Sequence, residues 1–143
     1  MERDPSLPPE PLPLTEASVQ EIQLELMRRR RFNEFDGPNV VASLRRHRKL
    51  WRAALMDRLG FVSEKHGSGW GLIKLRDLPQ NYWNVDDLFI LTDTLDQARE
   101  LERIAEEEDW KADNVTLLQN EDERGRQLGQ FPPSGYIISF WWD

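Results

Sequence analysis

The stretch Asp86–Leu118, DDLFILTDTLDQARELERIAEEEDWKADNVTLL, decides the fold, because it carries the patterns of a strand, a helix and a second strand in succession. Leu88–Leu91 is a continuous apolar run between polar residues, which is typical of a strand buried on both faces. Thr94 and Gln97 have the spacing of a capping box, in which each side chain binds a backbone N–H group of the first turn. A crossover helix is therefore predicted over residues 95–108.

One face of this predicted helix is apolar and should pack on a sheet. Its apolar residues recur at three- and four-residue steps: Leu95, Ala98, Leu101, Ile104 and Ala105. A second strand is predicted at Val115–Leu118, and a helix of about 14 residues is long enough to link parallel neighbours. The sequence thus predicts one βαβ crossover unit.

Two helices are predicted before this unit. The first begins after Thr15 or Ser18 and runs to about Phe32, and the second spans Asn39–Leu59; both have an apolar face at helical spacing. An Asp-Gly-Pro turn signal separates them. Residues 15–60 are therefore predicted to form an antiparallel helical hairpin.

Two further strands are predicted, at residues 69–75 and at Tyr136–Trp142. The residues of the last strand alternate between two faces: Tyr136, Ile138, Phe140 and Trp142 on one, and Ile137, Ser139 and Trp141 on the other. Because both faces are largely apolar, this strand is predicted in the sheet interior. The crossover helix should cover one side of it and the helical hairpin the other.

The predicted fold class is α+β, with an N-terminal helical hairpin packed on a mixed sheet of about four strands that contains the βαβ unit. A chain of 143 residues suits one domain. This single domain is predicted over residues 15–143, with the sheet and its crossover helix in residues 69–143. Residues 1–14 contain five prolines and are predicted to form a flexible tail.

Composition excludes several classes of function. The chain has no cysteine, which rules out disulfides, a thiol nucleophile and zinc–thiolate sites. No segment approaches the roughly 18 consecutive apolar residues that cross a bilayer, and the N-terminal stretch lacks an apolar signal-peptide core. A cytoplasmic protein without membrane contact is predicted.

The net charge of -7 is unevenly distributed, because residues 28–58 hold ten basic and three acidic side chains. Such a basic segment can bind nucleic-acid phosphates, or it can dock on acidic parts of the same chain or of a partner. The candidate residues for a partner or for nucleic acid are Arg28, Arg29, Arg45, Arg46, Arg48, Lys49 and Arg52.

No motif predicts a catalytic residue, a cofactor or a metal site. The glycine-rich segment at residues 66–71 precedes a predicted strand rather than a helix and lacks the spacing of a phosphate-binding loop. Asp93 follows the central strand, where open α/β sheets bind ligands, and Asp86, Asp87 and Asp96 are near in sequence. Helix capping explains the polar residues around Asp93 better than a magnesium site does.

These patterns favour a non-catalytic, cytosolic protein-interaction module, such as a regulator, an adaptor or a toxin-neutralising partner. Its partner would be another protein, and Tyr82, Trp83 and Trp141 are candidate aromatic contacts. One alternative is a nucleic-acid-binding protein that uses the basic hairpin of residues 28–52. The other alternative is a small enzyme with a site near Asp93. The oligomeric state is not predicted.

Overall fold

The computed structural model describes residues 12–30, 33–58 and 72–143 of the chain. In these ranges the helices are α1 (Val19–Arg28), α2 (Gly37–Arg46), α3 (Leu72–Asp77), α4 (Leu95–Glu107) and α5 (Glu121–Leu128), with 3₁₀ helices η1 (Arg48–Leu50) and η3 (Leu78–Gln80). The strands are β1 (Ala53–Asp57), β2 (Asp87–Thr92), β3 (Asn114–Leu118) and β4 (Tyr136–Trp141). None of the helices in these ranges has the length and apolarity needed to cross a bilayer.

The strands form one sheet in the order β1-β2-β4-β3, and every neighbouring pair is antiparallel. The predicted α+β class is confirmed, and α1 and α2 form the predicted helical hairpin, which packs on the sheet. The sheet is antiparallel rather than mixed. α4 links β2 to β3, which run in the same direction, but β4 lies between them and pairs with both. The predicted parallel neighbours are therefore separated by the last strand of the chain.

The second helix is shorter than predicted, because α2 ends at Arg46 and the chain turns into β1 before residue 59. Trp51 Nε1 donates a 2.9 Å hydrogen bond to the carbonyl oxygen of Leu44, which satisfies one of the acceptors left open at a helix end. In β1, Ala54 and Met56 are buried and alternate with exposed residues. A short apolar run of this kind fits a helix or a strand equally well by periodicity.

The predicted strand over residues 69–75 is wrong in its second half, since Leu72–Asp77 forms α3. The fourth strand of the sheet is β1 instead, which lies at one edge. The glycine-rich segment at residues 66–71, which includes the first part of that predicted strand, and residues 1–11 of the predicted tail lie outside the described residues.

β4 occupies the sheet interior, as predicted, and anchors the core. Ile138, Phe140 and Trp142 are fully buried on one side of the sheet. The Trp110 and Phe140 ring centroids are 5.0 Å apart in an edge-to-face contact, and Phe35 meets Trp142 in the same way at 4.6 Å. Trp142 Nε1 donates a 2.8 Å hydrogen bond to the carbonyl oxygen of Trp110, so the buried indole keeps a partner.

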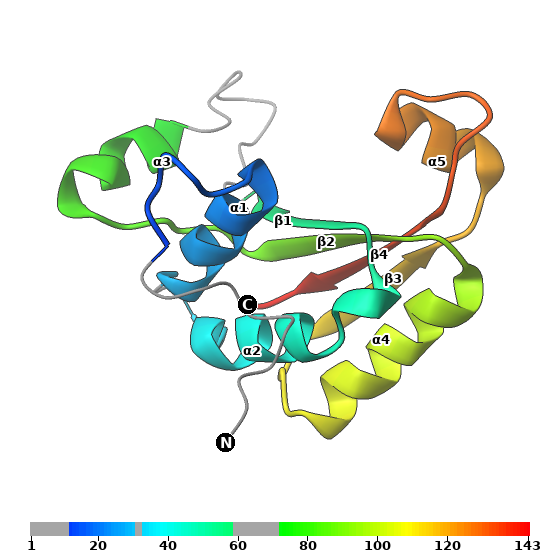
Figure 1. The fold of residues 1–143 in the computed structure, drawn as a ribbon, viewed down its shortest axis with the longest axis horizontal. Coiled ribbons are helices and arrows are strands. Elements are labelled where there is room, and N and C mark those ends of the chain that lie inside the picture. The colour runs from blue at the N-terminus through cyan, green and yellow to red at the C-terminus, as the bar shows by residue number, and fades with distance from the viewer. Residues whose placement is uncertain (1–11, 31–32, 59–71) are drawn as a thin grey trace.

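Within residues 12–30, 33–58 and 72–143, the helices cover one face of the sheet. α2 and α4 lie together below it in Figure 1, and their buried residues join those of the strands in one core. α1 lies beside the β1 edge, while α5 lies near the opposite edge, above β3. The expectation that the crossover helix and the hairpin would cover opposite faces of β4 is therefore wrong, and in the described residues the second face has no helix across it.

Candidate functional site

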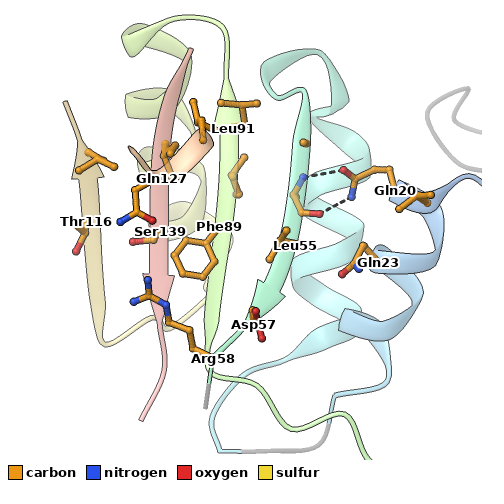
Figure 2. Close-up of a pocket in the computed structure, with 17 residues that line it drawn as sticks. Gln20, Gln23, Leu55, Asp57, Arg58, Phe89, Leu91, Thr116, Gln127 and Ser139 are labelled. Atoms are coloured by element: carbon orange, nitrogen blue, oxygen red, sulfur yellow. Dashed lines mark hydrogen bonds between the residues drawn. The ribbon is translucent and has the colours of Figure 1, made fainter. Parts of the chain in front are cut away.

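The uncovered face of the sheet forms a groove of about 720 Å³, which Figure 2 shows from above. The floor is apolar and draws on every strand, with Leu55, Phe89, Leu91, Leu118 and Ile137. These side chains alternate along the strands with the core residues of the covered face. Leu55 is 43% exposed although Ala54 and Met56 beside it are buried, so the floor is open to solvent.

The walls of the groove come from α1 and α5. Val19, Gln20 and Gln23 line it on the β1 side, and Gln127 and Leu128 line it on the β3 side. Val19 is 78% exposed, although it begins a helix whose other apolar residues are mostly covered. The polar groups of both walls are uncharged amides, which donate and accept hydrogen bonds without imposing a charge on a ligand.

Gln20 also closes the edge of the sheet. Its Nε2 donates a 2.7 Å hydrogen bond to the carbonyl oxygen of Ala54, and its Oε1 accepts a 2.9 Å hydrogen bond from Ala54 N (Figure 2). The side-chain amide thus takes the place of a neighbouring strand at β1. An edge filled in this way does not offer those backbone groups to an added strand.

Asp57 and Arg58, the two charged residues among the described lining of the groove, lie at one end of it. Asp57 forms an ion pair with Lys74 of α3. Burial works to raise the pKa of Asp57, but the hydrogen bond from Lys74 and the nearby Arg58 hold that pKa below its usual value. The Arg58 guanidinium lies 5.1 Å from the centre of the Phe89 ring, where the π face attracts a cation.

A pair of carboxyl groups lies beside this end of the groove. Asp87 is opposite Asp57 in the register of β1 and β2. Burial, a hydrogen bond with the side chain of Asp86 and the negative charge of Asp86 raise the pKa of Asp87 to about 7, against the opposing charge of Arg58. Trp141 Nε1 donates a 3.2 Å hydrogen bond to Asp86 Oδ2. At neutral pH the Asp87 carboxyl is therefore only partly ionised.

Most of the predicted basic candidates are already paired within the chain. Arg45 forms an ion pair with Glu21 at 2.7 Å and is largely covered. Arg48 lies over the Trp51 ring at 3.9 Å and donates to its carbonyl oxygen. The side chain of Lys49, in contrast, is exposed. Arg45 and Arg48 are therefore engaged by partners within the chain, and Lys49 is open to solvent.

Arg46 belongs to a cluster around Glu108, at the end of α4. Ser43 Oγ and Arg46 Nη2 donate to Glu108 Oε1 at 2.6 and 2.5 Å, and His47 Nε2 lies 2.7 Å from Glu108 Oε2. Asn39 Nδ2 donates to the Glu108 carbonyl oxygen at 2.8 Å. Burial works to raise the pKa of Glu108, but the three side-chain hydrogen bonds outweigh it and hold the pKa at about 2. The cluster is a structural clamp between α2 and α4.

The arginines at the end of α1 meet at a second hollow of about 430 Å³, lined by Arg28, Arg29, Arg30, Pro38 and Asn81. Arg28 and Arg29 both pair with Glu25, at 2.6 and 2.9 Å. Arg30 is buried, stacks on Phe35 and donates to Asn33 Oδ1, and burial lowers its pKa to about 10. These contacts favour the structural role of this basic run.

Asp93 lies in a surface ion pair, 3.0 Å from Arg52, which also donates to the carbonyl oxygen of Ser134 at 2.7 Å. The residues considered with it are not brought together, since Asp87 begins β2 and Asp93 follows the last residue of that strand. Among the described residues no group of three or more His, Cys, Asp or Glu side chains could hold a metal ion.

The aromatic candidates are divided between two places. Tyr82 is 38% exposed and Trp83 packs against the core, both after η3. Trp141 belongs to the open side of β4, together with Ile137 and Ser139 of the groove. None of the residues lining the groove is among the predicted site residues. The available signal is the alternation in Tyr136–Trp142, where Ser139 interrupts the apolar series on one face.

No protein-family model matches the chain, and no curated protein or solved structure shows significant similarity to it.

Proposed function

We propose that the chain is a non-catalytic protein-interaction module, acting as a regulator or an adaptor, and that its groove receives an amphipathic helix of a partner protein. One observation carries this proposal. The sheet presents an apolar floor from all of its described strands, and no helix of the described residues covers that floor. Exposed apolar surfaces of this kind with a polar rim are typical of interaction sites.

The floor favours a helix over an extended segment. A strand laid across apolar side chains would bury its own N–H and C=O groups without partners, which costs about 1–3 kcal/mol for each group in protein mutational data. A helix satisfies these groups internally and presents only side chains. Gln20 opposes the addition of a strand at the β1 edge, because its side-chain amide already forms hydrogen bonds with the N–H and C=O groups of Ala54.

The dimensions and the polarity of the groove suit the same occupant. Strands lie about 4.8 Å apart, so four of them span about 14 Å, and a helix with its side chains is about 10–12 Å across. The covered face offers a direct parallel, because α4 packs there with Ala98, Leu101, Ile104 and Ala105 buried. The uncharged amides of the walls match the polar flanks of such a helix.

The nucleic-acid alternative has less support. Five of its six candidate arginines are engaged by Glu21, Glu25, Glu108 and Asp93, and each of these ion pairs would have to open before phosphate could bind. The enzyme alternative has little support as well, because Asp93 is engaged by Arg52 and the described residues hold no His, Cys, Asp or Glu cluster that could bind a metal ion.

The test is a selection from a display library of amphipathic helices of about 18 residues, long enough to cross the sheet. The enriched peptides are then titrated against the purified full chain. The blocking variant is Ser139→Glu, which puts a charge on the half-exposed floor, and its control is Gln119→Glu, which adds the same charge at an exposed residue outside the groove.

We expect peptides that bind the wild-type chain and the control equally and lose about tenfold or more in affinity on Ser139→Glu, which corresponds to about 1.4 kcal/mol. Circular dichroism of each variant shows whether its fold is kept. A selection that yields no peptide sensitive to Ser139→Glu, with both variants folded, would contradict the proposed function.

A further inference from the structure

The charged residues at one end of the groove indicate which kind of helix would bind there. Apart from Asp57 and Arg58, the described residues that line the groove are uncharged. Asp57 is engaged by Lys74 in its ion pair. Lys74, a residue outside the groove, and the nearby Arg58 both lower the pKa of Asp57, and Arg58 is the one of these two cations that lines the groove.

Arg58 has no ion pair with a carboxylate of the described residues; its ring contact is with Phe89. Asp87 is near enough for Arg58 to act on its pKa, but the hydrogen bond with Asp86 and burial leave Asp87 only partly ionised at neutral pH. A guanidinium over an aromatic ring keeps its planar N–H groups available at its edge, where a carboxylate binds with two parallel hydrogen bonds.

The rest of the molecule opposes an acidic ligand. The chain as a whole carries a net charge of -7, so an acidic ligand is repelled by most of the surface. Arg58 is itself exposed, so the attraction between its guanidinium and a carboxylate is partly screened by water and salt. A basic residue at the same point would meet the Arg58 cation directly.

We propose that the partner helix carries an acidic residue whose carboxylate pairs with Arg58 above Phe89, so that the groove selects acidic amphipathic helices of partner proteins. This inference rests on the proposed function and names the class of partner. The apolar face of the helix supplies contact with the floor, and the Arg58 pair fixes the direction and register of the helix in the groove.

The test uses the peptides enriched in the selection described above. We expect an acidic residue at one shared position of the groove-dependent peptides. Arg58→Gln should then weaken binding by about tenfold, and so should replacement of the shared acidic residue by its amide, because either change removes one charge of the pair. The matched control, Arg126→Gln, removes an exposed arginine of α5 outside the groove and should leave affinity unchanged.

A charge exchange tests the contact itself. Arg58→Glu should prefer a peptide in which the shared acidic residue is replaced by lysine, and the combined change should recover part of the lost affinity. Peptides that lose affinity on Ser139→Glu but not on Arg58→Gln would overturn the inference and leave the proposed function in place. If no peptide depends on Ser139, the proposed function itself fails.

Discussion

The Glu108 side chain joins the end of α4 to α2. Its carboxylate accepts hydrogen bonds from Ser43, Arg46 and His47, which lie in α2 and directly after it. In the sequence it is one of four consecutive acidic residues at the negative end of a helix dipole, and this position predicts only a loss of helix stability. In the folded chain the three donors stabilise the Glu108 carboxylate and so hold α4 against α2.

Glu108→Gln should destabilise the fold by about 1–3 kcal/mol at pH 7, because hydrogen bonds to a charged acceptor are lost or weakened. The folded pKa of Glu108, about 2, lies below its ordinary value of 4.5, so the folded state favours the ionised form. This contribution is present above pH 4.5 and is lost as the pH falls from 4.5 toward 2. Urea unfolding at pH 7 and pH 3 measures it.

The matched control for this prediction is Glu106→Gln, an exposed residue near the end of the same helix. It should change the unfolding free energy by less than about 0.5 kcal/mol. Equal effects of the two substitutions at pH 7 would show that Glu108 acts only through net charge and not through the clamp.

Asp87 has the opposite dependence on pH. Its folded pKa of about 7 lies above its ordinary value of 3.8, so the folded state favours the protonated form. The resulting contribution to stability is complete below pH 3.8 and is lost as the pH rises through 7. Asp87→Asn should therefore raise the unfolding free energy at pH 8, and the difference from wild type should shrink toward pH 4. A constant difference over this range would contradict the raised pKa.

At the scale of elements, β1 depends on α1 for its outer edge. Gln20 supplies one donor and one acceptor to Ala54, in place of a further strand. Gln20→Ala should destabilise the fold by about 1–3 kcal/mol, because two hydrogen bonds to the edge are lost. Hydrogen exchange of the Ala54 amide should become faster to match.

Gln23→Ala, one turn further along the same helix face, is the control for the edge contact. Gln23 lines the groove wall beside Gln20. Its replacement should leave both the unfolding free energy and the exchange of the Ala54 amide near their wild-type values. Equal effects of both substitutions would mean that α1 holds β1 by apolar contact and not through the Gln20 amide.

Elements with strong local signals could be predicted from the sequence. The Thr94–Gln97 capping box forms as expected at the start of α4. β1 could not be predicted, because Ala53–Asp57 continues a long run of helix-forming residues. Its strand conformation comes from pairing with β2, which no local pattern encodes.

At the scale of the whole molecule, the two faces of the sheet differ in how they are covered. The core-facing residues Leu88, Ile90, Ile138 and Phe140 are fully buried under the helices. Phe89, Leu91 and Ile137, on the opposite face, line the groove. The sequence does not distinguish an apolar residue that faces the core from one that faces the groove. A strand with apolar residues on both faces is therefore predicted to be buried on both faces.

The candidate site could not be predicted for the same reason. Its lining residues come from α1, α5 and all the described strands, and no short motif contains them. The basic residues formed a candidate binding site in the sequence because they lie close together there. In the folded chain their acidic partners, such as Glu21 for Arg45 and Glu108 for Arg46, come from distant segments or other turns.

The central claim, that the groove face is open in the folded protein, is tested most directly by thiol labelling of single-cysteine variants, since the chain has no cysteine of its own. Ser139→Cys should react with a bulky maleimide within about tenfold of the rate of the exposed Lys49→Cys, whereas the buried Ala98→Cys should react only when the chain unfolds. If Ser139→Cys is as protected as Ala98→Cys in the folded protein, the sheet face is covered and the account is contradicted.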